Sequence, residues 1–170
     1  MLILIKDEFQ VIYSAFRGCR IMKLSTKGRY GLKAMLDLAI HNAEGQIALK
    51  SIAERQEVSE NYLEQLFALL KKAGLVKSIR GSQGGYNLAS QPQNITVGSI
   101  LRALEGSLAP VECVTEIDPA VCIRSEGCAT KLIWEKIRDK INEVVDSITL
   151  QDLLDDYRKA NSNEEYIYYI

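Results

Sequence analysis

The feature that most constrains the fold is a short helical pattern, a turn, a longer helical pattern and a glycine-rich segment, all within residues 49–88. Apolar spacing predicts a short helix over Leu49 to Arg55, followed by a turn at residues 56–58. Ser59 is a typical N-cap for the longer helix, which Gly74 ends. A short helix, a tight turn and a longer helix make up a helix-turn-helix.

Two β-prone runs follow at residues 75–79 and 86–88, and the segment Arg80-Gly-Ser-Gln-Gly-Gly85 joins them. We expect an antiparallel hairpin whose glycines supply backbone conformations with positive φ. A helix-turn-helix followed by such a hairpin is a winged helix. The sequence therefore predicts a mainly α fold, a winged helix-turn-helix with a small β-hairpin wing.

Helical patterns also flank this segment. The apolar residues between Thr26 and Asn42 recur at helical spacing, and Gly45 follows them. They predict an amphipathic helix ahead of the helix-turn-helix. After the hairpin, Thr96 is a typical N-cap for a connecting helix that Gly106 ends.

A long C-terminal helix is predicted over Ala129 to Ile148, with an apolar stripe at Ile133, Ile137, Ile141, Val144 and Ile148. The stripe can pair with the same helix of a second subunit, or it can pack on its own domain. Pairing is more economical, because so long a helix has little of its own domain to bury against. Thr149 and Asp152 then form a capping box for a last helix that reaches about residue 158.

Residues 1–21 differ in character from the rest, and Met22 opens a segment typical of a protein start. We expect either a start codon at Met22 or a real N-terminal extension. The segments expected are an N-terminal extension at 1–21, a winged-helix domain at 22–90, a connecting helix at 91–106, a cysteine loop at 107–128, a dimerisation helix and last helix at 129–159, and a C-terminal tail at 160–170.

Charge is distributed unevenly, although the net charge is only -1. Residues 22–88 carry ten Lys or Arg and six Asp or Glu, whereas residues 89–170 carry eight and fourteen. A basic half suits contact with a polyanion, and an acidic half suits self-association. No apolar stretch approaches the roughly 20 residues of a membrane span, and the chain start lacks a signal-peptide pattern. We therefore expect a cytoplasmic protein.

The first turns of the longer helix carry polar side chains suited to DNA. A helix fits the major groove, and the start of a recognition helix points its side chains at base edges. Asn61 and Gln65 can pair with adenine, and Glu64 can accept from cytosine. In the hairpin, Arg80 can enter a narrow minor groove. We predict a DNA-binding surface made of Ser59, Asn61, Tyr62, Glu64, Gln65, Arg80, Gly81, Ser82, Gly84 and Gly85.

Three segments carry a resemblance to a known family, namely KLSTKGRYGLKAMLDLA, SENYLEQLFALLKKAGLVKSIRGSQGGY and ITVGSILRALEG. From Met22 onward the chain resembles the Rrf2 family of winged-helix transcriptional regulators, in particular its IscR-like and CymR-like members. The resemblance implies a homodimer whose long helix crosses its partner. It also implies base or groove contacts for Asn61, Glu64, Gln65 and Arg80.

Three of the four cysteines, Cys113, Cys122 and Cys128, fall in a segment without helical periodicity. Thiolates are the usual ligands of iron-sulphur clusters, and an irregular loop can bend three of them around a small inorganic core. The position matches the cluster loop of IscR-like proteins, so the resemblance implies a cluster, of the 2Fe-2S type, at these residues. A zinc or purely redox thiol site and unliganded cysteines remain open.

The fourth ligand of such a cluster is not assigned. IscR-like proteins use a histidine three residues after the last cysteine, but Lys131 stands at that position, and the single histidine, His41, lies in the first helix. The remaining candidates are a residue of the partner subunit, an exogenous thiol, or one of the carboxylates Glu112, Glu116, Asp118 and Glu126.

The chain ends in an aromatic tail that includes Tyr168, Tyr169 and Ile170. Exposed side chains of this size are costly unless they dock somewhere. The tail can pack on the protein's own helices, or a partner can capture its terminal carboxylate. CymR-like proteins also end in a tyrosine-isoleucine tail, so the resemblance implies cysteine synthase as that partner.

Together these features predict a DNA-binding repressor of genes for iron-sulphur cluster assembly or for cysteine and sulphur metabolism, which senses through a cysteine-ligated cluster. The alternative is a CymR-like repressor without a cluster, controlled by binding of its tail to cysteine synthase. An enzyme is not expected, because the chain has one histidine and no nucleophile or nucleotide motif. A cysteine-based redox enzyme and an interaction subunit that no longer binds DNA are remote alternatives.

Overall fold

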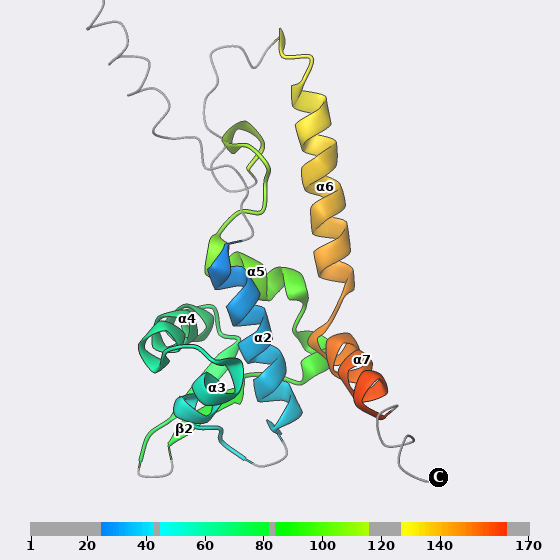
Figure 1. Ribbon diagram of the computed structural model, residues 1–170. Coiled ribbons are helices and arrows are strands. Elements are labelled where there is room, and N and C mark those ends of the chain that lie inside the picture. Colours follow the sequence, from blue (N-terminus) through cyan, green and yellow to red (C-terminus); the bar gives the residue numbers. More distant parts are fainter. Residues whose placement is uncertain (1–24, 43–44, 82–83, 116–126, 163–170) are drawn as a thin grey trace, which may run out of the picture. The chain divides into compact units, whose positions relative to one another are not determined.

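The computed structural model describes residues 25–42, 45–81, 84–115 and 127–162 (Figure 1). The chain divides into two compact units. The winged-helix unit consists of Leu24–Leu108 and Asp139–Ile170, and the loop unit contains Ala109–Arg138. The expectations for residues 1–21, for a start at Met22 and for the tail residues Tyr168, Tyr169 and Ile170 lie outside the described residues.

The winged-helix unit is mainly helical, with one small sheet. Its elements are α2 (Thr26–Ile40), α3 (Leu49–Gln56), α4 (Glu60–Lys72), β1 (Val76–Ile79), β2 (Gly85–Leu88), the 3-10 turn η2 (Pro92–Asn94), α5 (Val97–Glu105) and α7 (Leu150–Ser162). The loop unit contains the 3-10 turn η3 (Glu112–Val114), and α6 (Lys131–Ser147) runs from the loop unit into the winged-helix unit. This order confirms the predicted winged helix-turn-helix. Among the described helices, none is long and apolar enough to cross a membrane.

Helix α2 lies close to α5, because glycines remove the side chains that would separate them. A Cβ atom at Gly31 would overlap Leu104 of α5, and one at Gly28 would lie 2.8 Å from Oε1 of Glu105. That oxygen accepts hydrogen bonds from the backbone amides of Ser25 and Gly28, at 3.1 and 2.8 Å, and from the Ser25 hydroxyl at 2.6 Å. The Glu105 side chain at the end of α5 thereby accepts hydrogen bonds from backbone amides at the start of α2, which have no partner within that helix.

The turn between α3 and α4 is built as the sequence predicts. Helix α3 ends at Gln56, one residue later than expected, and Glu57 takes the left-handed conformation with a φ of 53°. The Ser59 hydroxyl caps α4 by accepting a hydrogen bond from the Tyr62 amide at 3.3 Å. Helix α4 is amphipathic and buries one face, at Leu63, Leu66, Phe67 and Leu70.

Strands β1 and β2 form the predicted antiparallel hairpin, with Val76 opposite Leu88. Gly81 has a positive φ of 129°, but Gly84 and Gly85 do not, so the predicted reason for these two glycines was wrong. They are needed for space instead. A Cβ atom at Gly84 would lie 2.7 Å from a backbone carbonyl oxygen, and one at Gly85 would lie 2.5 Å from another.

A single residue ahead of α3 extends the sheet. Ile47 donates its amide to the carbonyl of Tyr86 at 3.0 Å and accepts the amide of Tyr86 at 2.8 Å. This bridge was not predicted from the sequence, because a single residue carries no alternating pattern. It anchors the start of the helix-turn-helix to the wing.

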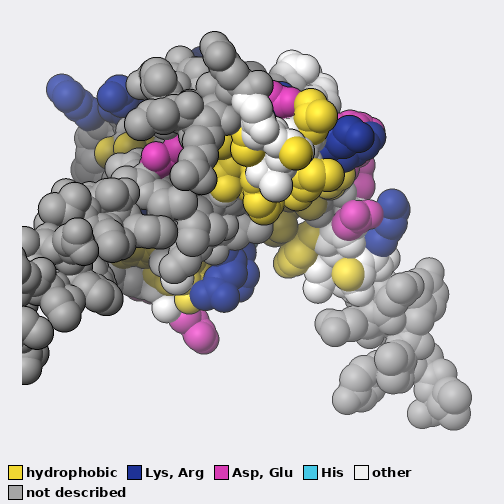
Figure 2. Space-filling view, turned by 90° about the horizontal axis from the view of Figure 1, so that it is seen from above, with side chains coloured by type: hydrophobic (Ala, Val, Ile, Leu, Met, Phe, Trp, Pro, Cys, Tyr) yellow, Lys and Arg dark blue, Asp and Glu magenta, His cyan; other side chains and the backbone are white. Residues whose placement is uncertain are grey.

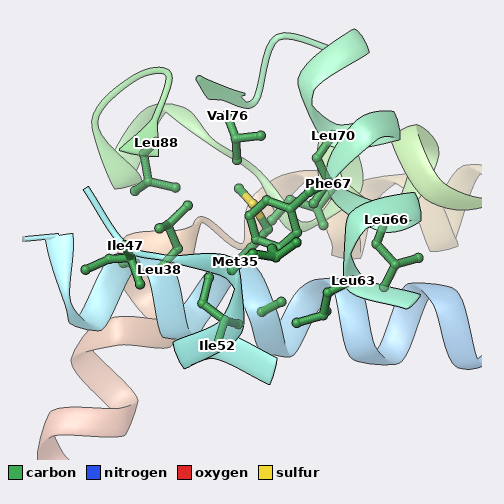
Figure 3. Close-up of a cluster of buried hydrophobic side chains, with 14 of the residues drawn as sticks. Met35, Leu38, Ile47, Ile52, Leu63, Leu66, Phe67, Leu70, Val76 and Leu88 are labelled. Atoms are coloured by element: carbon green, nitrogen blue, oxygen red, sulfur yellow. The ribbon is translucent and has the colours of Figure 1, made fainter. Parts of the chain in front are cut away.

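The core of the winged-helix unit lies where α2, α3, α4 and the sheet meet. Figure 3 shows side chains from all of them converging on Met35 and Phe67, which are fully buried. The Phe67 ring also contacts the ring of Tyr86, with centroids 4.7 Å apart. Helix α4 and strand β2 are therefore held by one continuous core, made chiefly of Met35, Leu38, Ile47, Ile52, Leu63, Leu66, Phe67, Leu70, Val76 and Leu88.

Helix α7 returns to the winged-helix unit. The predicted capping box is present: the Asp152 amide donates to the Thr149 hydroxyl at 3.1 Å, and the Asp152 carboxylate accepts the Thr149 amide at 2.8 Å. Leu150 and Leu154 are buried, and α7 contacts α2. The helix extends to Ser162, beyond the predicted end near residue 158, and the Ser162 hydroxyl bonds back to a carbonyl one turn earlier.

The apolar stripe of α6 is divided between two neighbouring faces. Ile141, Val145 and Ile148 pack against the cluster of Val97, Leu101 and Leu108 in the winged-helix unit. Ile133, Ile137 and Val144 follow helical spacing on the adjacent face, where they are 53, 38 and 55% exposed. Packing on the winged-helix unit therefore accounts for one part of the stripe, and the other part is exposed among the residues that the structure describes.

Candidate DNA-binding surface and cysteine loop

The face of α4 that is directed away from the core carries the predicted base-reading side chains. Asn61, Glu64 and Gln65 are exposed, and so is the cap residue Ser59. Leu63, Leu66 and Leu70 of the same helix are buried, which fixes the rotation of α4 about its own axis. The fold thus presents amides and a carboxylate on the outer surface of a helix whose inner surface is locked by packing.

Tyr62 is placed differently from the other predicted DNA-contacting residues of α4. Its ring is half-buried and meets the ring of Tyr30 edge to face, with centroids 6.1 Å apart. Its hydroxyl is buried and has no hydrogen-bond partner among the described residues. The geometry gives Tyr62 a packing role between α2 and the start of α4.

The wing residues lie on the same unit as α4. Arg80 and Gly81 are exposed at the end of β1, Gly84 and Gly85 are partly buried, and Ser82 lies outside the described residues. Lys71, in the last turn of α4, donates to the hydroxyl of Ser78 in β1 at 2.5 Å. Helix α4 and the wing are therefore joined by a polar contact as well as by the core.

Two cations of α2 that were not among the predicted site residues lie beside this surface. Arg29 and Lys33 are exposed and lie over the Tyr30 ring, 5.1 and 6.0 Å from its centroid. Because Tyr30 meets Tyr62, both cations lie near the start of α4. Their spacing of four residues, with a tyrosine between them, was the available signal. Positive side chains beside a recognition helix suit DNA phosphates.

The cysteine loop is described at two of its three cysteines. Cys113 lies in η3 and Cys128 lies shortly before α6, both are half-buried free thiols of the loop unit, and Cys122 lies outside the described residues. The Thr130 hydroxyl, 3.2 Å from the Cys128 sulphur, is the main cause of a lowered pKa of Cys128. Backbone amides at the start of α6 and the Lys131 charge act in the same direction.

Free thiols with a thiolate-favouring environment are the donor chemistry that an iron-sulphur cluster needs. Cys128 fits that requirement, and Cys113 is a second free thiol in the same loop unit. Within the described ranges, no group of three Cys, His, Asp or Glu side chains is arranged to hold a metal ion, so the proposed set depends on Cys122.

The other ligand candidates are placed as follows. Glu112 lies in η3 beside Cys113, whereas Glu116, Asp118 and Glu126 lie outside the described residues. Lys131, at the position of the expected histidine, pairs with Glu135 at 3.9 Å. His41 ends α2 in the winged-helix unit, with its Nδ1 atom 2.8 Å from the carbonyl oxygen of Asp37.

Comparison with known proteins gives a consistent answer. A family model described as "Rrf2: Iron-dependent Transcriptional regulator" matches residues 24–156. The transcriptional regulator CymR of Bacillus subtilis (strain 168) is 48% identical over 149 residues, which cover 88% of this chain and 100% of that protein. The transcriptional regulator IscR of Vibrio campbellii is 40% identical over 135 residues, 79% of each chain.

Solved structures of relatives share the fold. The structure of T. potens IscR matches with a TM-score of 0.69 and 52% identity, covering 86% of this chain and 96% of that one. The structure of B. subtilis CymR, titled the global cysteine regulator of that organism, matches with a TM-score of 0.67 and 49% identity, covering 79% and 98%. The winged helix, its exposed reading face and these matches together show that the chain belongs to the Rrf2 family of transcriptional regulators.

Proposed function

We propose that this Rrf2-family regulator is a cytoplasmic homodimer that represses genes of iron-sulphur cluster assembly or of cysteine and sulphur supply. The observation that carries the proposal is the exposed polar face of α4, at Asn61, Glu64 and Gln65, set opposite a fully buried leucine face. A helix held in this way can enter the major groove without disturbing the core.

Base reading is assigned to α4 and groove contact to the wing. Asn61 and Gln65 each present an amide that can pair with an adenine edge, and Glu64 can accept from cytosine. Arg80 extends from the end of β1 toward a minor groove. Arg29, Lys33 and Lys72 contact phosphates, which position the helix and carry no sequence information.

Dimerisation is assigned to the uncovered face of α6. Ile133, Ile137 and Val144 are large apolar side chains that are exposed within the described part of the chain. Figure 2 shows hydrophobic side chains gathered on one face of the molecule, with Lys, Arg, Asp and Glu side chains along the part of its border that is not grey. An apolar patch with a charged rim is typical of a surface that a second copy covers.

Sensing is assigned to Cys113, Cys122 and Cys128, which would hold a cluster of the 2Fe-2S type with a fourth ligand not yet identified. When bound, the cluster would supply a redox-sensitive and iron-sensitive group. The three thiols would hold it, and the Thr130 hydroxyl, 3.2 Å from the Cys128 sulphur, lowers the pKa of Cys128 and so favours the thiolate that binds metal. The family description as iron-dependent supports this assignment.

The cluster assignment is tested on protein purified without oxygen. We expect visible absorption together with bound iron and sulphide, and we expect Cys128→Ser to lose most of both. Cys19→Ser is the matched control, because Cys19 lies far from the three loop cysteines in the sequence, and it should retain the absorption. Wild-type protein without iron, sulphide or visible absorption contradicts the assignment.

A second candidate is supported by the relative that aligns along its whole length, CymR, at 48% identity. In that case the tail residues Tyr168, Tyr169 and Ile170 bind cysteine synthase, and the terminal carboxylate is captured in its active site. Deleting Tyr169 and Ile170 should abolish binding to cysteine synthase. Unchanged affinity would refute this candidate and leave the cluster assignment in place.

The DNA-binding proposal is tested by recovering genomic DNA fragments on the purified protein. We expect enrichment of a few promoters upstream of sulphur-metabolism or cluster-assembly genes. Binding to them should weaken steeply as salt rises, because phosphate contacts release counterions. Uniform recovery of all fragments would contradict the proposal.

A further inference from the structure

Asp37 of α2 is the single buried charged residue among those that the structure describes, with 4% of its surface exposed. Burying a carboxylate is strongly unfavourable unless it is paired and hydrogen-bonded. Its partners come from the last turn of α3, the first helix of the helix-turn-helix. No sequence pattern indicated a role for Asp37 or for its partner Arg55.

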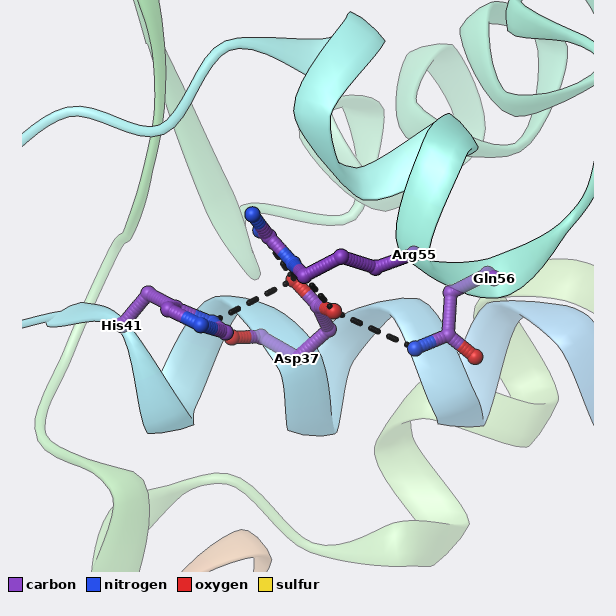
Figure 4. A network of polar contacts seen from close by, with 4 residues as sticks. All are labelled: Asp37, His41, Arg55 and Gln56. Atoms are coloured by element: carbon purple, nitrogen blue, oxygen red, sulfur yellow. Dashed lines mark hydrogen bonds and ion pairs between the residues drawn. The ribbon is translucent and has the colours of Figure 1, made fainter.

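The pairing is bidentate (Figure 4). Arg55 donates from Nε to Oδ2 of Asp37 at 2.9 Å and from Nη2 to Oδ1 at 2.6 Å. Gln56 donates from Nε2 to Oδ2 at 3.1 Å, and Nδ1 of His41 lies 3.5 Å from Oδ1. A planar guanidinium bound through two nitrogens fixes a direction as well as a distance.

The pair of Asp37 and Arg55 lies where it can determine the direction of α4. Arg55 and Gln56 are the last two residues of α3, Glu57 makes the left-handed turn, and Ser59 already caps α4. Three residues therefore separate the fixed end of α3 from the recognition helix. A rotation of the last turn of α3 would pass directly into the direction of α4.

Stability alone does not account for the pair. Replacing a buried ion pair with well-packed apolar side chains is often neutral or stabilising. An apolar pair cannot reproduce the two parallel hydrogen bonds, which fix the orientation of Arg55 relative to Asp37. The Arg55 side chain is 35% exposed, but two of its three guanidinium nitrogens are already bound to a buried carboxylate, which favours a role within the protein over a phosphate contact.

We infer that Asp37 and Arg55 are positioning residues for DNA reading, which hold α3 so that the polar face of α4 meets the base edges at the correct angle. The inference rests on the proposed DNA-reading role of α4. In this proposal, two residues that do not contact DNA contribute to the discrimination between DNA sequences.

The test compares two affinities for each variant. The specific probe is the duplex that wild-type protein selects from a randomised pool, and the non-specific probe is a scrambled duplex of the same length. For Arg55→Lys we expect the specific affinity to fall at least about tenfold, comparable to losing one bidentate base contact. The non-specific affinity and the salt slope should stay as in wild type, because no phosphate contact is lost.

A second variant separates a loss of DNA discrimination from a loss of folding. The double substitution Asp37→Leu with Arg55→Met removes both charges, so no unpaired charge is buried, and we expect a thermal midpoint close to that of wild type with the same loss of discrimination. The matched control is Lys50→Gln. Lys50 is an exposed cation on the same helix that pairs with Glu54 at 3.9 Å, and its loss should leave the ratio of the two affinities unchanged.

Three results would overturn the inference. If both variants fold and keep the wild-type ratio of affinities, the pair has no positioning role. If Arg55→Lys weakens both probes equally and lowers the salt slope by about one, Arg55 contacts phosphate itself. If wild-type protein selects no sequence, the proposed function fails first and the inference falls with it, and that result is visible before any variant is made.

Discussion

At the residue scale, the two ends of α4 have different chemistry. Asn61 stands in the first turn, where an amide can pair with a base, and Lys72 stands in the last turn, where a cation can meet a phosphate. Both are exposed, so substituting either leaves the core intact. Their effects on DNA binding are therefore separable.

Asn61→Ala should cost about 1–3 kcal/mol of discrimination at one base pair and relax the preference there. Lys72→Gln should weaken binding to all sequences and lower the salt slope by about one. Titrations of matched and mismatched duplexes at several salt concentrations measure both effects. Equal weakening of every duplex by Asn61→Ala would contradict the assignment of α4 as the base-reading element.

A second residue-scale contact joins α5 to α6. Arg102 donates to the two carboxylate oxygens of Asp146 at 2.7 and 2.8 Å, and also to the side chain of Asn142 at 2.8 Å. The Arg102 hydrogen bonds lower the pKa of Asp146 below its ordinary value of 3.8. Gly98 makes this approach possible, because a Cβ atom there would overlap the Asp146 carboxylate.

Asp146→Asn should lower the free energy of unfolding at neutral pH by less than about 1 kcal/mol, because the pair is partly exposed. Since folding lowers the pKa, the contribution is fully present above the ordinary carboxyl value of 3.8 and is lost as the pH falls through the folded value. Denaturant unfolding at neutral and at acidic pH checks this. Asp156→Asn, at an exposed pair with Lys159, is the control and should leave the free energy of unfolding at neutral pH unchanged. A difference between wild type and Asp146→Asn that persists at low pH would exclude the ionised pair as its source.

At the scale of the elements, close packing of α2 on α5 determines where α2 presents Arg29 and Lys33. Gly31 occupies the point of closest approach, facing Leu104. A glycine in the interior of a helix lowers the stability of the fold by about 0.5–1 kcal/mol relative to alanine. We infer that the room which Gly31 leaves for Leu104 outweighs this loss.

Gly31→Ala should therefore destabilise the protein by about 1–3 kcal/mol through overpacking, despite the better helix propensity of alanine. Leu104→Ala alone should also destabilise it, by leaving a cavity. The double variant should be more stable than the sum of the two effects predicts, since each change relieves the other. Strict additivity in denaturant unfolding would contradict the close contact.

The same scale shows what the sequence could and could not predict. Helices α2 to α5 and the hairpin follow local signals, such as the Ser59 cap and the buried leucines of α4, and the structure confirms them. The Ile47 bridge, the role of Gly84 and Gly85, and the pairing of Asp37 with Arg55 depend on residues that are distant in the chain or on backbone proximity. The spacing of apolar residues along the sequence does not predict such contacts.

At the scale of the whole molecule, the exposed apolar face of α6 predicts a dimer. Ile137→Glu should place a charge in the contact between two copies and shift the protein toward monomers at micromolar concentration. Sedimentation equilibrium measures the shift, and Lys136→Glu, at an exposed neighbouring position, is the control. Wild-type protein that is monomeric under these conditions would exclude α6 as a dimerisation helix.

The most direct test of the central claim is selection of DNA by the wild-type protein from a randomised duplex pool. A dimer that inserts two α4 helices into the major groove should enrich a two-fold symmetric sequence, with half-sites about 10 base pairs apart or a multiple of that spacing. A pool that stays random after repeated rounds would contradict the account that α4 reads DNA sequence.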